Sequence, residues 1–370
     1  MNNKKNIIFF ACQLPPPVHG MSAVNKCVLN LLEIEAQQNE NIQVFNTFGT
    51  GNSIKKFIIR FSKGLNIVYK LVLNFKNRKV TTYYLAVSGG FGIIHEIIPW
   101  IFAGFLTKKR IIHHHSFNYC NNKSYLMKIM QLFKTTNITN IFLCLKHKEL
   151  FFRNYFIKNS LNKYLIIPND FILEYNDFPV KEKNLNPFKR IVIGHLSNLT
   201  SEKGFYTIIE IFEKLKNNKN IIFEIVGPTN DDKINLLLKQ YSDSFPEQFF
   251  YLGSLYGSQK QAWFNQIDLF LFPSKYNNEA YPLVLIEAIH ANAVILTTPI
   301  GCLCEINHSS FIFEYEEYVN EVIKFINRYY ADNLFQMKCN DELHQLYNTS
   351  KQKAIDAKRD LLKEFFDTTK

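Results

Sequence analysis

The sequence lacks a long hydrophobic run and a glycine-rich dinucleotide motif. The apolar segment 93–106 contains His95 and Glu96 and is shorter than the ~20 residues that a membrane-spanning helix needs. No segment is therefore expected to cross a bilayer. No Gly-x-Gly-x-x-Gly follows an expected strand, because the glycines of residues 89–92 have the wrong spacing. This absence argues against an oxidoreductase with the usual dinucleotide motif.

The seven cysteines are also uninformative as a framework, since their number is odd and their positions are scattered. Neither a disulfide framework nor a zinc-ligand spacing can be recognised, and a reducing cytoplasm fits this pattern best. Lys4 and Lys5 precede an apolar run at 7–12, as at the start of a signal peptide, but three prolines end the run and no small-residue cleavage site follows. Residues 7–12 are expected to form the first strand of a cytoplasmic protein.

Acidic residues are absent from positions 41–95, in a chain whose net charge is +11. One side of a helix through this region carries four cations, namely Lys56, Arg60, Lys63 and Lys70. The opposite side carries Phe61, Leu65, Val68 and Val72. The helix either packs on the surface of its own domain or rests on anionic lipid headgroups, and both can hold together. Nucleic-acid binding is not predicted, because charge alone favours it.

The chain has 370 residues, which favours two domains of roughly 150–200 residues each. Short apolar runs alternate with amphipathic stretches in both halves, so we expect an α/β protein with largely parallel sheets. The charged segment 177–189 contains two prolines and is the best candidate for a linker. The expected strands are 7–12, 42–45, 82–87, 110–114, 141–145, 164–167, 191–194, 221–226, 249–252 and 269–272. The expected helices include 22–35, 203–216, 232–241 and 350–366.

The most informative stretch follows the apolar strand at 269–272, which ends in Pro273 and Ser274. Pro282 suits the first position of a helix, where its missing N–H is no loss. Glu279 then lies in the loop before this helix, and Glu287 lies in its second turn. Two acids at this spacing are common on solvated helix faces, so the surrounding pattern decides their meaning.

That pattern resembles the donor-sugar signature of glycosyltransferase family 4: strand, Pro-Ser, acid, aromatic-Pro-Leu, acid-bearing helix, then an apolar run at 293–298 and Gly301. An ordinary βαβ unit of a doubly wound sheet is the alternative. Over nearly the whole chain the order of elements resembles the GT-B fold, in which two Rossmann-like, doubly wound parallel-sheet domains face a central cleft. The resemblance implies an acceptor-side domain at 1–180, a nucleotide-sugar domain at 181–349 and a helix at 350–370 that crosses back onto the first domain.

The segment 194–204 is expected to hold phosphate, because a strand end, backbone N–H groups, a helix start and one ammonium meet there. The resemblance implies that Lys203 and Gly204 bind the donor diphosphate. The family arginine upstream of this pair is missing, and His195 and Asn198 lie where it would be. As an alternative, Lys203 is a solvated lysine in the first turn of a helix.

The resemblance implies further donor contacts in the second domain. Gly227, Ser254 and Leu255 would approach the base and ribose, Glu287 would bind the ribose hydroxyls, and Glu279 would point at the donor sugar. Backbone N–H groups would come from the segment Ala280, Tyr281, Pro282 and Leu283. Asn169 is expected to be structural.

In the first domain, the resemblance places Gly20 close to the diphosphate and His115 close to the donor sugar. A plain turn is the alternative for Gly20. Side chains alternate along a strand, so His113 and His115 share one face and His114 takes the other. A buried histidine pair and a metal site are the alternatives, although further ligands are not apparent nearby.

The resemblance implies retaining, metal-independent transfer of a hexose from a nucleotide diphosphate sugar to a hydroxyl of a lipid-linked or cell-envelope glycan, of the capsule, O-antigen or lipopolysaccharide type. No cofactor is expected. The chain has no Asp-x-Asp to hold a cation, so Lys203 and helix ends would supply positive charge. The expected location is the inner face of the cytoplasmic membrane, on anionic lipid. An epimerase of the same fold and an inactive membrane-binding paralogue remain alternatives.

Overall fold

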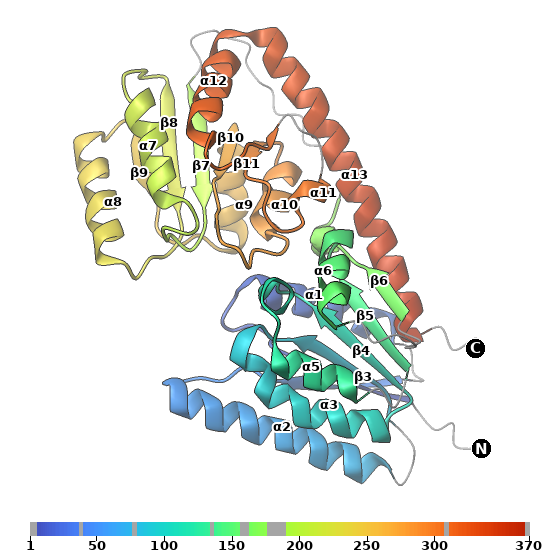
Figure 1. Cartoon of the computed structure of the whole chain (residues 1–370). Coiled ribbons are helices and arrows are strands. Elements are labelled where there is room, and N and C mark those ends of the chain that lie inside the picture. Colours follow the sequence, from blue (N-terminus) through green and yellow to red (C-terminus); the bar gives the residue numbers. More distant parts are fainter. Residues whose placement is uncertain are drawn as a thin grey trace. The chain divides into compact units, whose positions relative to one another are not determined.

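A computed structural model of the chain describes residues 6–36, 40–75, 80–133, 137–155, 163–175, 190–306 and 311–366. The chain forms two compact units, each built on a parallel sheet (Figure 1). Unit 1 comprises Met1–Ile172, Asn277–Tyr281 and Lys353–Lys370. Unit 2 comprises Leu173–Tyr276 and Pro282–Gln352. The expected α/β class is confirmed.

Unit 1 contains a six-stranded sheet in the order β2-β1-β3-β4-β5-β6, and all its strand pairs are parallel. Its strands are β1 Asn6–Cys12, β2 Glu40–Asn46, β3 Val80–Val87, β4 Lys109–His114, β5 Asn137–Phe142 and β6 Lys163–Ile166. Its helices include α1 Gly20–Glu35, α2 Ser53–Phe75, η1 Gly90–Ile93, α3 Ile94–Leu106, α4 Asn118–Asn121, α5 Tyr125–Leu132, α6 Leu145–Tyr155 and η2 Asn169–Ile172. The chain changes direction across the sheet at β1, which has β2 on one side and β3 on the other.

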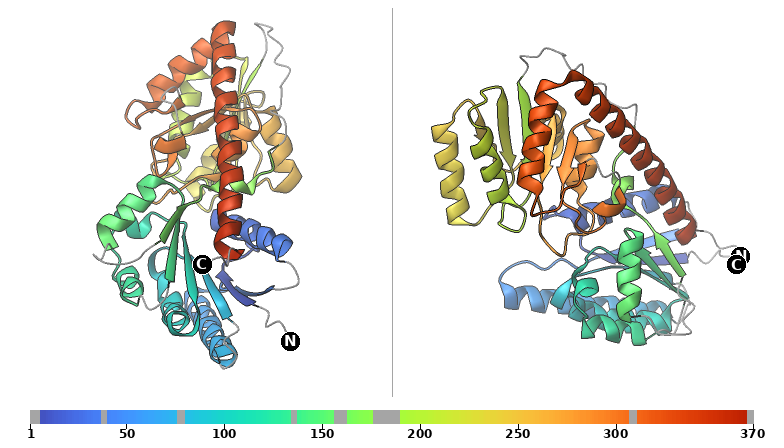
Figure 2. Two further views of the ribbon diagram at one scale, coloured as in Figure 1. Left: turned by 90° about the vertical axis from the view of Figure 1, so that its right-hand side faces the viewer. Right: turned by 45° about the horizontal axis from the view of Figure 1, so that its top comes forward.

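The central strands of unit 1 are covered on both faces, as Figure 2 shows for the helices around the sheet. Phe9, Phe10 and Ala11 of β1 are each 0% exposed, although neighbouring side chains in a strand point to opposite faces. Continuous apolar strands of this kind are typical of parallel sheets between two helical layers. The apolar run at 7–12 is therefore a strand, as expected.

Unit 2 contains a five-stranded parallel sheet in the order β11-β10-β7-β8-β9. Its strands are β7 Ile191–Leu196, β8 Ile221–Val226, β9 Phe249–Tyr251, β10 Leu269–Phe272 and β11 Val294–Thr297. Its helices include α7 Phe205–Leu215, α8 Asp232–Ser244, α9 Gly257–Gln266, α10 Leu283–His290, α11 Leu303–Ile306 and α12 Tyr318–Ala331. Here the direction changes at β7, between β8 and β10.

Some predicted boundaries are wrong. The terminal helix does not begin at 350, because α13 runs without a break over Asn333–Phe366, a stretch with no glycine or proline to end it. The strand expected at 141–145 ends at Phe142, and Leu145 already begins α6. Pro282 is the residue before the first turn of α10, not its first helical residue. Within the ranges that the structure describes, no helix is long and apolar enough to span a bilayer.

The last turns of α13 belong to unit 1, where they bury a charged side chain. The carboxylate of Glu364 accepts a hydrogen bond from Oγ1 of Thr139 at 2.7 Å. It also forms ion pairs with Lys109 and Lys163. A carboxylate that is only 3% exposed needs such partners, so β4, β5 and β6 are each tied to this helix end.

Candidate donor site

The sheet of unit 2 has a switch point at β7, because the strands that follow it are added first on one side and then on the other. In open parallel sheets, ligands bind outside the carboxyl ends of the strands at such a point. The loop after β7 carries Lys203 and Gly204, and the loop after the neighbouring β10 leads to α10. The two segments singled out from the sequence therefore come from the two strands at the switch point.

Gly204 allows these two loops to touch. It precedes α7 with a φ of +85°, a conformation that favours glycine. A Cβ atom at this position would lie 2.2 Å from the carbonyl oxygen of Pro273, in the loop after β10. The N–H of Lys275 also donates to the carbonyl of Glu202 at 2.8 Å. The start of α7 is thus held directly against the end of β10.

The side chain of Lys203 lies over two aromatic rings at this place. Its ammonium is 4.8 Å from the ring centroid of Tyr276 and 5.9 Å from that of Phe272. Such contacts position a cation without cancelling its charge. Together with the positive N-terminal end of α7, the ammonium makes this loop suitable for an anionic group such as a diphosphate.

His195 does not fit the expected role of a donor contact. The ring is 1% exposed, its Nδ1 lies 2.9 Å from the carbonyl oxygen of Leu271, and its Nε2 lies 2.9 Å from Oγ of Ser197. Burial lowers the pKa of His195 to about 4, so the ring is neutral, with Nδ1 donating to Leu271 and Nε2 accepting from Ser197. Both nitrogens are used within the unit, and His195 fixes the loop after β7. Asn198, by contrast, is exposed on that loop.

The carboxyl ends of β8 and β9 supply the next residues of the predicted site. Gly227 follows β8 with a φ of +127°, and a Cβ there would lie 1.8 Å from the carbonyl oxygen of Ser197. Gly227 thus supports the loop after β7, which makes its glycine a packing requirement. Ser254 is exposed and Leu255 is half-buried in the segment after β9.

Glu287 has one carboxylate oxygen available. Its side chain is 16% exposed and pairs through Oε1 with the ammonium of Lys260 from α9. Its Oε2 is buried without a hydrogen-bond partner among the residues that the structure describes. A buried carboxylate oxygen is stabilised by a donor, which a ligand hydroxyl can supply. Leu283 begins α10, so its N–H has no acceptor within the helix.

The segment Asn277–Tyr281 belongs to unit 1 and is fixed there at both ends. The carbonyl of Asn277 accepts from Nδ2 of Asn121 at 2.6 Å, and that of Tyr281 accepts from Nδ2 of Asn169 at 3.1 Å. The hydroxyl of Tyr281 donates to the carboxylate of Asp170 at 2.5 Å. Glu279 is half-buried between these anchors, and Ala280 is 7% exposed.

Asp170 was not singled out from the sequence. It follows Asn169 directly, and nothing in an Asn-Asp pair indicates a contact with a residue more than a hundred positions away. The side chain of Tyr281 is thus used within unit 1 and is not a contact for the donor.

Gly20 in unit 1 opens α1, where His19 and Ser22 form a reciprocal cap. A Cβ at Gly20 would meet no atom within 4 Å, and its φ is not in the left-handed region. Neither packing nor backbone conformation therefore requires a glycine here. The missing side chain leaves the N-terminal end of α1 open to a ligand.

The histidines at the end of β4 alternate as predicted. The ring centroids of His113 and His115 lie 4.0 Å apart, whereas the ring of His114 stacks on Phe142 on the other face. His113 is 0% exposed and its Nδ1 lies 2.8 Å from the hydroxyl of Tyr84, while His115 is half-buried. Burial, with smaller effects of His114 and His19, lowers the pKa of His115 to about 3. Its ring is therefore neutral.

The basic helix α2 turns part of its cationic side toward unit 1. Arg60 donates to Oγ of Ser88 at 2.9 Å, and Lys63 donates to the carbonyl of Phe48 at 2.6 Å. Two of the four cations proposed to meet a membrane thus have partners inside unit 1, while Lys56 and Lys70 are exposed. The residues that the helix buries are Gly64, Ile67 and Leu71. Phe61, Leu65 and Val72 are 38%, 48% and 49% exposed.

A metal site is not apparent in the part of the chain that the structure describes. No three side chains of histidine, cysteine, aspartate or glutamate come together there in a way that could hold an ion.

Part of the chain matches a family model, and the whole chain is similar to solved structures. Residues 177–348 match the family model described as glycosyl transferases group 1. The structure of HepE (Alr3699) from Anabaena in complex with UDP is similar with a TM-score of 0.66 and 14% identity, over 97% of this chain and 99% of that one. Sucrose-phosphate synthase from Thermosynechococcus elongatus is similar with a TM-score of 0.70 and 12% identity, over 99% of this chain and 100% of that one. No match was found among curated protein sequences.

At these identities, the similarity to solved structures shows a shared fold. The two parallel-sheet units have the GT-B fold, as the sequence predicted. The switch-point loops and α10 lie within residues 177–348, which match the model of glycosyl transferases group 1.

Proposed function

We propose that the chain is a retaining glycosyltransferase of family 4 that transfers a hexose from a nucleotide diphosphate sugar to a hydroxyl of a lipid-linked or cell-envelope glycan. The observation that carries this proposal is the switch point of unit 2. There the ammonium of Lys203, the start of α7 and the unpartnered Oε2 of Glu287 provide the contacts that a diphosphate and a ribose need. The HepE structures with UDP and UDP-glucose support a nucleotide-sugar donor.

In this proposal the departing diphosphate is stabilised without a metal ion. Lys203 and the N–H groups that begin α7 and α10 neutralise the charge that develops as the glycosidic bond breaks. Glu287 accepts a ribose hydroxyl, and Glu279 and the neutral His115 bind hydroxyls of the sugar. The acceptor attacks from the face that the diphosphate leaves, and a phosphate oxygen takes its proton. Retention of configuration follows from that direction of attack.

The first experiment identifies the donor. Uridine and guanosine diphosphate sugars are added to the protein one at a time, and the melting temperature is measured. A donor at a hundred times its dissociation constant stabilises the folded protein by about 2.7 kcal/mol. The proposal predicts a rise for at least one of these sugars. No rise with any of them would contradict it.

Two alternatives are separated by turnover. An epimerase of the same fold would convert the donor into another nucleotide sugar when no acceptor is present, whereas a transferase releases the nucleoside diphosphate only slowly until an acceptor is added. An inactive paralogue would bind the donor without turnover under either condition. Lys203→Ala and Glu279→Ala proteins serve as controls for turnover by a contaminant.

We further propose that unit 1 binds an anionic membrane surface on the cytoplasmic side, through α2. Figure 1 shows α2 along the edge of unit 1, beside α3. The apolar residues that this helix leaves exposed are Ile54, Phe57, Ile58, Phe61, Leu65, Tyr69, Val72, Leu73 and Phe75. Its exposed cations are Lys55, Lys56 and Lys70. An apolar face flanked by lysines, with no acidic residue from 41 to 95, suits the interface of an anionic bilayer.

A further inference from the structure

A pocket of about 520 Å³ opens in unit 1 at the carboxyl ends of its first three strands. It is lined by residues that follow β1, β2 and β3, among them Gln13, Phe48 and Gly92, and by the first turns of α2. This is the switch point of the sheet of unit 1, where parallel sheets bind ligands. The contacts proposed above for the diphosphate and the ribose, Lys203 and Glu287, belong to unit 2, whereas this pocket belongs to unit 1.

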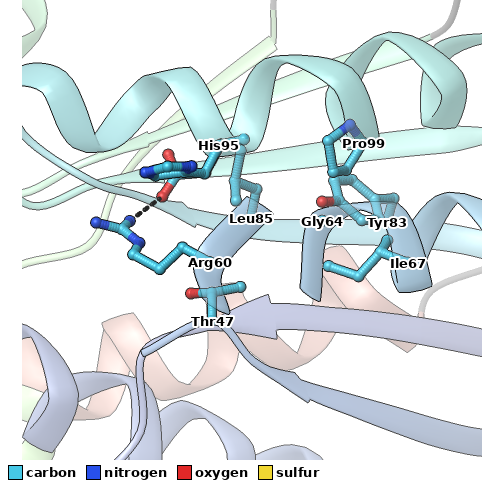
Figure 3. A pocket seen from close by; sticks show the side chains of 9 residues that line it. Thr47, Arg60, Gly64, Ile67, Tyr83, Leu85, His95 and Pro99 are labelled. Carbon is cyan, nitrogen blue, oxygen red and sulfur yellow. Dashed lines mark hydrogen bonds and ion pairs between the residues drawn. The ribbon is translucent and has the colours of Figure 1, made fainter. Parts of the chain in front are cut away.

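One wall of the pocket is cationic. Lys56 and Arg60 line it together with His95, whose pKa is lowered by burial and by Arg60, and Arg60 is paired with Glu96. Figure 3 shows Arg60 and His95 from the side of a smaller cavity that they share with this pocket, with the ion pair from Arg60 to Glu96 as a dashed line. The carboxylate of Glu96 also accepts from the N–H of Ser88 at 3.1 Å and from the Ser88 hydroxyl at 2.5 Å. Glu96 is therefore bonded both to Arg60 and to the residue that follows β3.

Two nitrogens at this wall have no protein partner among the described residues. They are Nε of Arg60 and Nδ1 of His95, and both atoms are buried. A buried guanidinium N–H without an acceptor is unfavourable, and an anionic oxygen is the acceptor that it binds most strongly. The unpartnered Nε of Arg60 therefore favours an anionic ligand at this place.

The chain holds Arg60 in a fixed position. A Cβ at Gly49 would lie 2.9 Å from Cγ of Arg60, and a Cβ at Gly92 would lie 3.3 Å from its Nη1. Two glycines thus let the backbone approach the arginine side chain from two segments. With Ser88 and Glu96 bonded to one end of the guanidinium, Arg60 is positioned before a ligand arrives.

The rim of the pocket is apolar. Phe57, Phe91 and Ile94 line the pocket and are 47%, 89% and 41% exposed. Phe57 packs edge-on against His95 with 4.6 Å between ring centroids, and its ring stacks with Phe61 at 6.3 Å. The rim thus continues into the exposed apolar face of α2. A ligand with an anionic group and a hydrocarbon chain fits both parts at once.

We propose that this pocket binds the phosphate group of an amphiphilic acceptor, with the phosphate on Lys56, Arg60 and His95 and the hydrocarbon chain along Phe57, Phe91 and Ile94. This inference rests on the proposed glycosyltransferase function, since it names the class of acceptor: a lipid phosphate. Two cations, of which Arg60 is held by Ser88 and Glu96, favour phosphate over a carboxylate with a single charge. A nucleotide is disfavoured because the rim is apolar and open.

Titration calorimetry of the full-length protein tests the proposal with three probes below their micellar concentration: farnesyl phosphate, farnesol and inorganic phosphate. Farnesyl phosphate should bind at least about ten-fold more tightly than either of the others, because only it has both groups. Lys56→Gln should weaken its binding about ten-fold. Lys55→Gln is the matched control, since Lys55 is an exposed neighbour that does not line the pocket, and it should change the affinity less than about two-fold.

Phe91→Ser tests the apolar part without touching the folded core, because Phe91 is 89% exposed. It should weaken farnesyl phosphate about five-fold and leave inorganic phosphate unchanged. Equal affinities for inorganic phosphate and farnesyl phosphate would overturn the proposal, as would equal effects of the Lys55 and Lys56 substitutions. The donor-induced rise in melting temperature is measured in parallel. If that rise is intact while farnesyl phosphate does not bind, the pocket is wrongly assigned and the proposed function stands.

Discussion

Arg60 lies 3.5 Å from the buried carboxylate of Glu96, so the cationic side of α2 turns toward its own unit. At Gly64 the helix comes so close to α3 that a Cβ would lie 2.9 Å from the carbonyl oxygen of His95. The apolar side consequently faces away from the unit. The helix thus buries Gly64, Ile67 and Leu71 but leaves a second apolar face exposed, which is the basis of the membrane proposal.

Phe61→Asp combined with Leu65→Asp should reduce sedimentation with phosphatidylglycerol vesicles at least about ten-fold, because each side chain loses its favourable transfer into the bilayer interface. Leu236→Asp is the matched control, since Leu236 is a 67% exposed leucine on α8 in the other unit. Equal sedimentation of the double variant and the control protein would rule out this face as the membrane contact.

Glu96 should lower the stability of unit 1 as the pH rises from about 4.5 to about 7, against the opposite contribution of histidines whose pKa is lowered by burial, such as His115. Burial raises the pKa of Glu96 from 4.5 to about 7, against the opposing effects of Ser88 and Arg60. The unfolded chain therefore loses this proton at lower pH than the folded one, which disfavours folding across that window. Glu96→Gln should therefore make the stability of unit 1 rise more steeply with pH across this window. Urea unfolding, followed by Trp100 fluorescence in a Trp263→Phe background, measures the free energy of unfolding at each pH. The same slope with and without Glu96→Gln would contradict a raised pKa of Glu96.

Glu364→Gln should lower the free energy of unfolding of unit 1 by about 3 kcal/mol, because Lys109 and Lys163 lose the charge between them. Burial alone would raise the pKa of Glu364, but hydrogen bonds from Lys109, Lys163 and Thr139 bring it below its ordinary value. The stabilisation is therefore present above about pH 4.5 and is lost as the pH falls through the lowered pKa. Glu321→Gln, in the exposed ion pair with Lys324, is the control and should change stability by less than about 0.5 kcal/mol. An equal effect of both substitutions would show that the buried group is not stabilising.

Gly227→Ala should abolish donor binding and destabilise unit 2 by about 3 kcal/mol, because the added Cβ overlaps the carbonyl of Ser197 and displaces the loop after β7. Gly253→Ala is the matched control, because it introduces backbone strain without a steric overlap. Gly253 also has a positive φ, of +66°, but an added Cβ would meet nothing within 4 Å. It should lose about 1 kcal/mol and retain donor binding. Melting curves with and without the donor compare the two.

The sequence was sufficient to predict the sheets, because both faces of the central strands are buried and their apolar runs are continuous. Phe270 and Phe272 are nearly inaccessible, as such a run requires. The sequence was also sufficient to place His113 and His115 on one face, because side chains alternate along an extended chain and His115 directly follows β4.

The orientation of α2 could not be predicted, because an amphipathic pattern does not say which side packs. Glu96, the buried partner of Arg60, lies 36 positions further on. The role of His195 could not be predicted either, because its partner is the backbone carbonyl of Leu271 on the neighbouring strand, and any residue type supplies such a carbonyl. The ties of Tyr281 to Asp170 and of Glu364 to Lys163 likewise join distant segments whose local sequence carries no sign of them.

The central claim is that Lys203 binds the diphosphate of a nucleotide-sugar donor at the switch point of unit 2. Titration calorimetry with the nucleoside diphosphate of the identified donor tests it most directly, on the original protein, on Lys203→Ala and on Lys275→Ala. Lys275 is the matched control, an exposed lysine in the loop after β10 whose ammonium lies 5.4 Å from the ring of Tyr315. Lys203→Ala should weaken binding about thirty-fold and Lys275→Ala less than about three-fold. Unchanged affinity of the Lys203→Ala protein would contradict it.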